Sequence, residues 1–214
     1  HQPIQYIIGE ADFMGEKFKV DKSVLIPRDE TEILVRETIK LVNENNCKSV
    51  LDMCTGSGCI ACMIAKLTNA QVIGTDISTE ALHIAFSNME KMELFNKASF
   101  RKSDLYSKIR EDEKFDIIVS NPPYIPIKMK KTIQREVSFE PDLALYTNDE
   151  SGLYFYKKII ENAKNYLNNN GSVLFEVMQG QAVYVLELFE KFGFLNMEII
   201  PDLALIDRVV KAKN

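Results

Sequence analysis

The sequence contains little histidine and no excess of positive charge. Its only histidines are His1 and His83, and His1 is the first residue. This scarcity argues against a multi-histidine metal site, and it makes a Ser-His-Asp triad a poor basis for catalysis. The formal net charge is −5, so the chain as a whole offers no basic surface for gripping nucleic acid phosphates. We therefore expect no metal and no stable nucleic acid partner.

Long apolar runs and a secretion signal are also missing. No stretch of about 18 apolar residues, the length of a membrane span, occurs in the sequence. The N-terminal residues lack the basic and apolar regions of a signal peptide. We expect a cytoplasmic protein with no membrane partner.

Cysteine is confined to one segment of the chain. All four cysteines, Cys47, Cys54, Cys59 and Cys62, lie within sixteen positions. A disulfide framework would spread them along the chain, so this clustering favours reduced thiols. Cys59 and Cys62 have the spacing of a redox or zinc half-site, but they lie in an apolar helical pattern and no second ligand pair follows. A packing role is the better interpretation.

What is present is an ordinary globular composition, with 46% hydrophobic and 27% charged residues over 214 positions. From residue 49 onward, apolar strand patterns alternate with helical patterns, which indicates βαβ units around a parallel sheet. We predict an α/β fold with a doubly wound, mostly parallel, seven-stranded Rossmann-like sheet. The last strand should be antiparallel, because only a Pro201-Asp202 turn precedes it.

The predicted segments can be given by number. Strands are expected at 50–53, 71–75, 99–102, 115–120, 172–177, 195–200 and 205–210, and helices at 28–42, 59–66, 78–90, 151–167 and 181–192. Residues 6–9, 13–15 and 18–20 suggest short strands and turns, so residues 1–28 should form a small β-hairpin and linker before a main domain at 29–214.

A glycine-rich turn between the first main-domain strand and the next helix is the first chemical signal. It contains Asp52, Cys54, Thr55, Gly56, Ser57 and Gly58. Glycines allow a ligand to approach the backbone closely, and the helix N-terminus offers free amides. The pattern fits a dinucleotide fingerprint, but Asp52 would repel a pyrophosphate, whereas it could hold the ammonium group of S-adenosylmethionine.

Two further acidic positions fit this donor. Asp76 closes the second strand, where it could accept bonds from both ribose hydroxyls; the alternative is a cap on the helix that begins at Ser78. At the end of the third strand, Asp104 could accept from the adenine amino group while Leu105 covers the ring. A plain turn aspartate explains Asp104 nearly as well.

The fourth strand runs directly into Asn121, Pro122, Pro123 and Tyr124. The prolines make this loop rigid at the carboxyl edge of the sheet. A planar amide or aromatic nitrogen is a poor nucleophile because its lone pair is delocalised. The Asn121 side-chain oxygen and the Pro122 carbonyl can accept its N–H bonds, and Tyr124 can stack on the planar group. Positioning then supplies most of the acceleration, and no histidine base is required.

With these residues, the sequence resembles the peptide chain release factor glutamine methyltransferases. The similar stretches are residues 2–9, 24–28, 30–32, 55–61, 76–78, 120–125, 140–141 and 207–210. The resemblance implies that residues 54–58, Asp76, Leu105 and Asn121 contact the methyl donor. It also implies that residues 121–124 hold the glutamine amide of a Gly-Gly-Gln loop, with a release factor as the protein partner.

Several positions depart from the family pattern. Cys54 stands where glycine is usual, and Leu105 stands where an aromatic residue is frequent, which implies weaker adenine stacking. Val177 and Met178 follow Glu176 in place of Ile-Gly, and Ile206 replaces a glycine. Family members also carry a helical domain before the position of Gln2, so we expect the chain to represent substrate docking only in part.

Three alternatives stay open at this point. A nucleic acid methyltransferase acting on adenine amines shares the Asn-Pro-Pro-Tyr loop, and the basic run at 128–135 could face phosphates, although such runs are more often solvated. A donor-binding module without catalysis would explain the lost glycines. A nicotinamide dehydrogenase is disfavoured by Asp52 and by the proline loop.

Overall fold

The structure is a computed structural model, and it describes residues 2–214. Its helices are α1 (Ile4–Ile8), α2 (Asp29–Asn45), α3 (Cys59–Leu67), α4 (Thr79–Lys91), α5 (Asp142–Leu145), α6 (Tyr154–Ala163) and α7 (Ala182–Lys191), with 3₁₀ turns η1 (Ile127–Lys131) and η2 (Val137–Phe139). Its strands are β1 (Glu10–Phe13), β2 (Glu16–Lys19), β3 (Ser49–Met53), β4 (Gln71–Asp76), β5 (Ala98–Lys102), β6 (Phe115–Ser120), β7 (Ile125–Pro126), β8 (Tyr146–Thr147), β9 (Leu167–Glu176), β10 (Leu195–Pro201) and β11 (Asp207–Lys213).

The central sheet has seven strands in the order β10-β11-β9-β6-β3-β4-β5. Strand β11 is antiparallel to both of its neighbours, whereas the pairs formed by β9, β6, β3, β4 and β5 are parallel. The predicted sheet and its antiparallel last strand are confirmed. The chain order reverses between β3 and β6, so a crevice opens at the carboxyl ends of these two strands.

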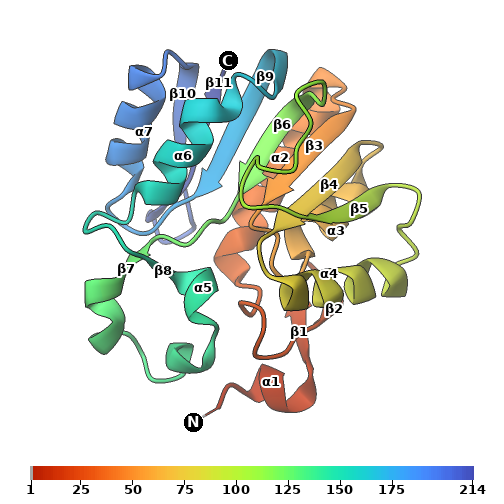
Figure 1. Ribbon diagram of the computed structural model, residues 1–214, viewed down its shortest axis with the longest axis vertical. Helices are drawn as coiled ribbons and strands as arrows, with labels where there is room; N and C mark the ends of the chain where they lie inside the picture. Colours follow the sequence, from red (N-terminus) through yellow and green to blue (C-terminus); the bar gives the residue numbers. More distant parts are fainter. Residues whose placement is uncertain (1) are drawn as a thin grey trace.

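Helices cover both faces of the sheet (Figure 1). Apolar residues of α2 and α3 pack on one face, where Leu34 and Ile64 are fully buried. Residues of α6 and α7 pack on the other face around Tyr156 and Phe189. The continuously apolar α3 is buried along nearly its whole length, which accounts for Cys59 and Cys62 as packing residues.

The small N-terminal hairpin is present and packs below the sheet. Strands β1 and β2 pair antiparallel, and Phe13 and Phe18 join the core beneath α3. The Asn88 side chain of α4 accepts from Lys19 N and donates to Lys19 O, so the hairpin is fixed to the sheet's helical layer. The division at residue 28 stays a prediction.

The structure corrects three predicted segments. Residues 4–8 form a helix rather than a strand, since Pro3 starts the turn and Gly9 closes it by donating to Gln5 O. Helix α6 is shorter than predicted, because the Asn168 side chain donates to Asp116 and draws residues 167–171 into β9. The last turn is longer, since Asp202 accepts from the amides of Ala204 and Ile206.

Candidate active site

The predicted site residues meet at the carboxyl edge of the sheet, where β3 and β6 lie side by side. Met53 pairs with Ser120, so the glycine turn and the proline loop leave the sheet next to each other. Two adjoining cavities share Cys54, Asp76 and Pro123, and the larger of them has a volume of about 260 Å³. The segment 125–153, with η1, η2 and α5, lies below this edge (Figure 1).

The glycine turn is a tight backbone cradle. Thr55 N donates to Thr75 O, and Gly58 N donates to Thr55 O. Gly58 has a φ of +78°, and a Cβ there would lie 2.9 Å from the Phe100 ring. Glycine is required at this position by both conformation and space. Thr55, Gly56 and Ser57 line the cavity, and their contact with the donor stays a prediction.

Asp52 lies behind the turn rather than in the cavity. It is fully buried, and its Oδ2 accepts from the Thr55 hydroxyl and from Ala61 N. Its Oδ1 has no hydrogen-bond partner in the described structure. Burial raises the pKa of this carboxyl to about 7. Contact with the donor ammonium stays a prediction; the observed contacts organise the turn.

Asp76 links the glycine turn to the residues that begin α4. Its Oδ2 accepts from Gly56 N at 2.9 Å, and its Oδ1 accepts from Ser78 N at 2.9 Å. Burial raises the pKa of Asp76, although these amides oppose the shift. The cap of α4 is made by Ser78, whose hydroxyl accepts from Ala81 N. Asp76 therefore lines both cavities with lone pairs left to accept from ribose hydroxyls.

Cys54 occupies the position where the family pattern has glycine. Its φ of +59° is left-handed, a conformation that costs a residue with a Cβ about 1–2 kcal/mol. The side chain lines both cavities, and burial raises the pKa of its thiol well above the usual range. The thiol is therefore a neutral wall of the site.

The predicted adenine end of the cavity carries Asp104 and Leu105. Both line the larger cavity, and Leu105 has a left-handed φ of +46° that turns the chain there. Tyr154 and Phe155, at the start of α6, line the same cavity. They bring aromatic surface beside the position where the family pattern often has an aromatic residue in place of Leu105.

The proline loop is held by side chains from distant segments. The Ser120 hydroxyl donates to Met53 O, which fixes the start of the loop against β3. The Asn121 side-chain nitrogen donates to the Thr31 hydroxyl at 3.3 Å, and Asn121 lines the cavity together with Pro123. Pro122 is buried, so the rigid turn leaves its carbonyl as a fixed feature of the backbone.

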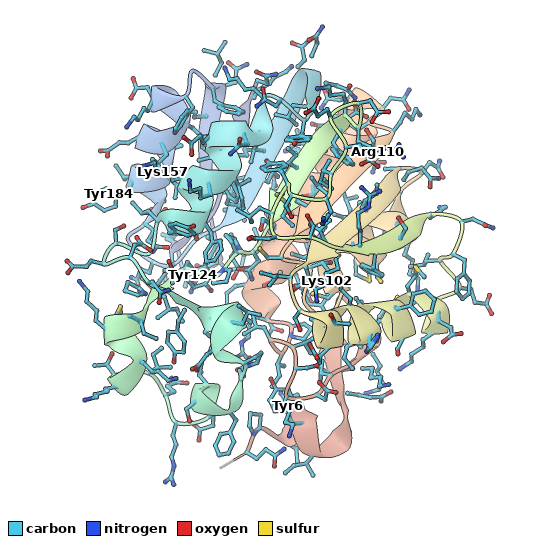
Figure 2. The ribbon with its side chains drawn as sticks, in the orientation of Figure 1. Tyr6, Lys102, Arg110, Tyr124, Lys157 and Tyr184 are labelled. Carbon is cyan, nitrogen blue, oxygen red and sulfur yellow. The ribbon has the colours of Figure 1, made fainter. Side chains whose placement is uncertain are left out.

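Tyr124 ends the loop against a buried carboxyl group. Its hydroxyl donates to Glu176 Oε1 at 3.3 Å, and Glu176 Oε2 accepts from the Thr31 hydroxyl at 2.6 Å. Figure 2 shows Tyr124 between α6 and the segment that carries α5. Burial raises the pKa of Glu176 to about 7, with the two hydroxyl groups opposing the shift. Burial and Glu176 together raise the pKa of Tyr124.

Gln181 and Gly152 fix the far end of the loop. The buried Gln181 side chain donates to Tyr124 O at 3.1 Å and to Ser151 O at 3.2 Å. Gly152 has a φ of +76°, and a Cβ there would lie 2.2 Å from Tyr124 O. Only glycine lets the chain before α6 approach the loop this closely.

Sequence reasoning missed the supporting residues of this site: Thr31, Gly152, Glu176 and Gln181, and the cavity-lining Leu25 and Pro27. Thr31 and Glu176 are 145 positions apart, and no local spacing connects them. The available signal was indirect. Residues 24–28 and 30–32 belong to the stretches that resemble the family, and Glu176 matches a glutamate of the family pattern.

The cavity fits the donor that the sequence predicts. Asp76 lines the cavity beside Thr55, Gly56 and Ser57, whereas the space at Gly58 is closed by Phe100 and Ala85. Thr55, Gly56 and Ser57 would hold the methionine portion, Asp76 the ribose, and Asp104 with Leu105 the adenine. These positions follow the order of the strands β3, β4 and β5 along the sheet edge.

A Rossmann-like sheet with a glycine turn, a ribose-side acid and an Asn-Pro-Pro-Tyr loop defines a class of methyltransferases. The chain agrees, since residues 29–138 match the family model "Methyltransferase small domain". It is 42% identical to the release factor glutamine methyltransferase of Flavobacterium psychrophilum, over 98% of this chain and 75% of the relative. It is 46% identical to that of Streptococcus pneumoniae, over 89% of this chain and 67% of the relative. The chain belongs to the release factor glutamine methyltransferase family.

A solved structure supports the fold. The 16S rRNA N2 G1207 methyltransferase of Thermus thermophilus, determined with AdoMet and guanosine, matches with a TM-score of 0.64 at 18% identity. The match covers 96% of this chain and 49% of that protein. Among residues 2–214, no helix is long and apolar enough to cross a membrane.

Proposed function

We propose that this chain transfers a methyl group from S-adenosylmethionine to the side-chain amide nitrogen of the glutamine in the Gly-Gly-Gln motif of a peptide chain release factor. The observation that carries the proposal is the position of Asn121. Its side chain lines the donor cavity, and its nitrogen is already engaged by Thr31. The Asn121 oxygen is then the atom available to accept an N–H from a substrate amide.

The donor side of the site supports S-adenosylmethionine as the cosubstrate. The donor supplies an electrophilic methyl group on a sulfonium sulfur. Asp76 would accept from the two ribose hydroxyls, and Asp104 and Leu105 line the same cavity as Asp76. The neutral wall made by Cys54 leaves the acids as the charged groups of the cradle.

The acceptor side supports an amide as the nucleophile. The Asn121 oxygen and the Pro122 carbonyl accept the two N–H bonds, and Tyr124 contributes a flat face. The nitrogen lone pair then forms the N–C bond while the C–S bond breaks and sulfur keeps the electron pair. The extra proton on nitrogen leaves to solvent afterwards. Holding the nitrogen in line supplies the main rate gain, since orientation alone contributes up to about 7–11 kcal/mol.

An adenine amine in DNA or RNA is the second candidate, because it is also a planar nitrogen that Asn121 and Tyr124 can hold. The basic run does not favour it. Lys130 lies within ion-pair distance of Asp142 and over the Tyr146 ring, and Lys128 is near Glu150. These local carboxylates offset the charge that a phosphate backbone requires.

The decisive experiment offers one labelled donor to both substrate classes. The protein is incubated with methyl-labelled S-adenosylmethionine and either a purified release factor or DNA and RNA of mixed sequence. We expect label on the release factor, and mass spectrometry of its peptides should place it on the Gly-Gly-Gln glutamine. A release factor with that glutamine changed to alanine is the matched control. Label on nucleic acid and never on the glutamine would refute the proposal.

Soluble release factors are found where translation occurs, so the proposal includes a cytoplasmic location. Fluorescence microscopy of the tagged chain in its own host should show an even signal through the cell interior. A signal confined to the envelope would contradict this part of the proposal.

A further inference from the structure

We propose that Thr31 and Glu176 are positioning residues that fix which way the Asn121 amide points, so that its oxygen and not its nitrogen faces the substrate. The inference rests on the proposed function, because it explains how the amide-binding oxygen is selected. It is carried by a chain of hydrogen bonds that runs from the cavity wall into the core.

The chain has three members and two links. The Asn121 nitrogen lies 3.3 Å from the Thr31 hydroxyl oxygen, and that hydroxyl lies 2.6 Å from Glu176 Oε2. Thr31 and Glu176 are 3% and 4% exposed, so water does not compete for these atoms. An unpaired polar group at this depth is destabilising, so the donors and acceptors must match along the chain.

The ionised form of Glu176 dictates the direction of every link. A carboxylate accepts and cannot donate, so the single Thr31 proton is directed toward Glu176. Thr31 then presents only lone pairs to Asn121. The Asn121 group facing Thr31 must therefore be the donating nitrogen, which leaves its oxygen toward the cavity. The charge on Glu176 thus determines the orientation of the Asn121 amide, although the two side chains are not in contact.

Protonation of Glu176 removes this constraint. A neutral carboxyl group can donate to Thr31, and Thr31 can then donate to Asn121. The Asn121 amide is satisfied in that case with its oxygen turned inward and its nitrogen toward the cavity. Two N–H groups would then face each other at the substrate amide, and binding in the reactive geometry would be lost.

The same carboxyl group also holds the other end of the loop. Tyr124 donates to Glu176 Oε1, so Asn121 and Tyr124 are anchored on one side chain. The sheet register places it there, since Ser120 of β6 pairs with Phe175 of β9 and the next residues are Asn121 and Glu176. Both ends of the substrate-holding loop therefore depend on one buried group.

The groups around Glu176 determine its pKa, and therefore the pH below which the Asn121 amide can reverse. Thr31 and Tyr124 donate to its carboxyl, the Tyr156 hydroxyl donates to its main-chain oxygen, and Glu30 and Arg208 act through charge. Burial raises the pKa of Glu176 to about 7 from an ordinary value of 4.5, and Glu30 adds to the rise while Arg208 opposes it. The carboxylate is present above this pH and is lost as the pH falls through it.

Variants of Thr31 give the first test. Thr31→Val keeps the shape but removes the hydroxyl, and we expect kcat to fall about tenfold or more, as for the loss of one buried hydrogen bond. Thr31→Ser keeps the hydroxyl and should rescue kcat to within about threefold. Donor affinity, measured by calorimetry, should stay close to wild type in both. Thr38→Val removes another buried hydroxyl from the same helix, one that donates to Leu34 O, and controls for packing.

The pH profile gives the second test. For the wild type, kcat/KM for the release factor should fall on the acid side with a midpoint near pH 7. Glu176→Gln should lower the plateau and abolish this acid limb, because its amide does not titrate. A wild-type profile that is flat between pH 6 and 8, or a Thr31→Val variant with wild-type kcat, would overturn the proposal.

A third measurement separates this inference from the proposed function. The ¹⁵N-labelled side-chain amide of Asn121, assigned with Asn121→Ala, should shift with pH in the wild type and not in Glu176→Gln or Thr31→Val. This reading needs no substrate. A wild-type protein that methylates no release factor would refute the proposed function alone. A wild-type Asn121 amide whose chemical shift does not change with pH would refute the positioning role alone.

Discussion

The two sides of the cleft are built in different ways. The donor side consists of residues 52–58 and Asp76, and the hydrogen bonds of its two carboxyl groups, Asp52 and Asp76, join residues at most 20 positions apart. The acceptor side consists of Asn121–Tyr124, and it is held by Thr31, Glu176 and Gln181, which lie 52 to 90 positions away. The donor side is thus a local backbone motif, whereas the acceptor side is assembled by the tertiary fold.

This difference has a chemical reason. The amides and carboxylates proposed to bind the donor lie on one strand–turn–helix unit and on the end of the neighbouring strand β4. The acceptor nitrogen must be held in line with a methyl group to a fraction of an ångström, and a loop by itself lacks that rigidity. Buried side chains on α2, on β9 and at the residue before α7 supply it.

The largest expected effect comes from removing the central group of the acceptor side. Asn121→Ala should lower kcat by on the order of 10³, because one of the two acceptors for the substrate amide is lost. The dissociation constant of S-adenosylmethionine should change only a few fold, as the donor side is intact. Stopped-flow or radiolabel assays with calorimetry measure both quantities. Unchanged turnover would remove Asn121 from the mechanism.

Damage to the donor side should show the opposite pattern. Asp76→Ala removes the acceptor of Gly56 N and Ser78 N, and we expect donor affinity to weaken roughly 30-fold, as for the loss of hydrogen bonds to a charged group. At saturating donor, kcat should fall far less than in Asn121→Ala. A loss that appears wholly in kcat would show that the two sides are not separable.

The distant support of the acceptor side can be tested with two glycines. Gly152→Ala places a Cβ 2.2 Å from Tyr124 O, so we expect overpacking to add about 1–3 kcal/mol of destabilisation to the cost of the left-handed φ of +76°, and kcat to be about tenfold lower. Gly180→Ala is the matched control, since Gly180 has a φ of +87° but an empty surrounding. It should show only the cost of the left-handed conformation, about 1–2 kcal/mol. Equal effects in urea unfolding and in kcat would contradict the role of Gly152.

The last prediction concerns protein stability and the donor-side residue Asp52. Burial raises the pKa of Asp52 to about 7 in the folded state, from 3.8. The folded state therefore binds a proton that the unfolded state releases, and wild-type stability falls as pH rises from about 4 to 7. Asp52→Asn has no carboxyl group to titrate at this position. The free energy of unfolding of the variant relative to wild type should therefore increase over that pH range. A difference in unfolding free energy that is constant from pH 4 to 8 in urea titrations would contradict the raised pKa of Asp52.

Local patterns in the chain determined most of the fold. The apolar alternation of β3, β4 and β6 and the helical period of α3 and α4 predicted these elements to within a residue or two. Where prediction failed, one cause was a distant contact, since Asn168 bonds Asp116 and extends β9. Another was local, since Asp202 accepts from the nearby amides of Ala204 and Ile206 and lengthens the last turn. The helix at residues 4–8 depends on a local Gly9 cap that its apolar pattern concealed.

The site divides along the same line. The sequence by itself determined the glycine turn, Asp76 and the Asn121–Tyr124 loop, because their chemistry depends on residue types at short spacing. Only the tertiary structure decided that Asp52 lies behind the turn and that Thr31, Glu176 and Gln181 support the loop. The physical reason is that hydrogen bonds between segments follow from sheet register and helix packing, which bring Asn121 and Glu176 to neighbouring strand ends although 55 positions separate them.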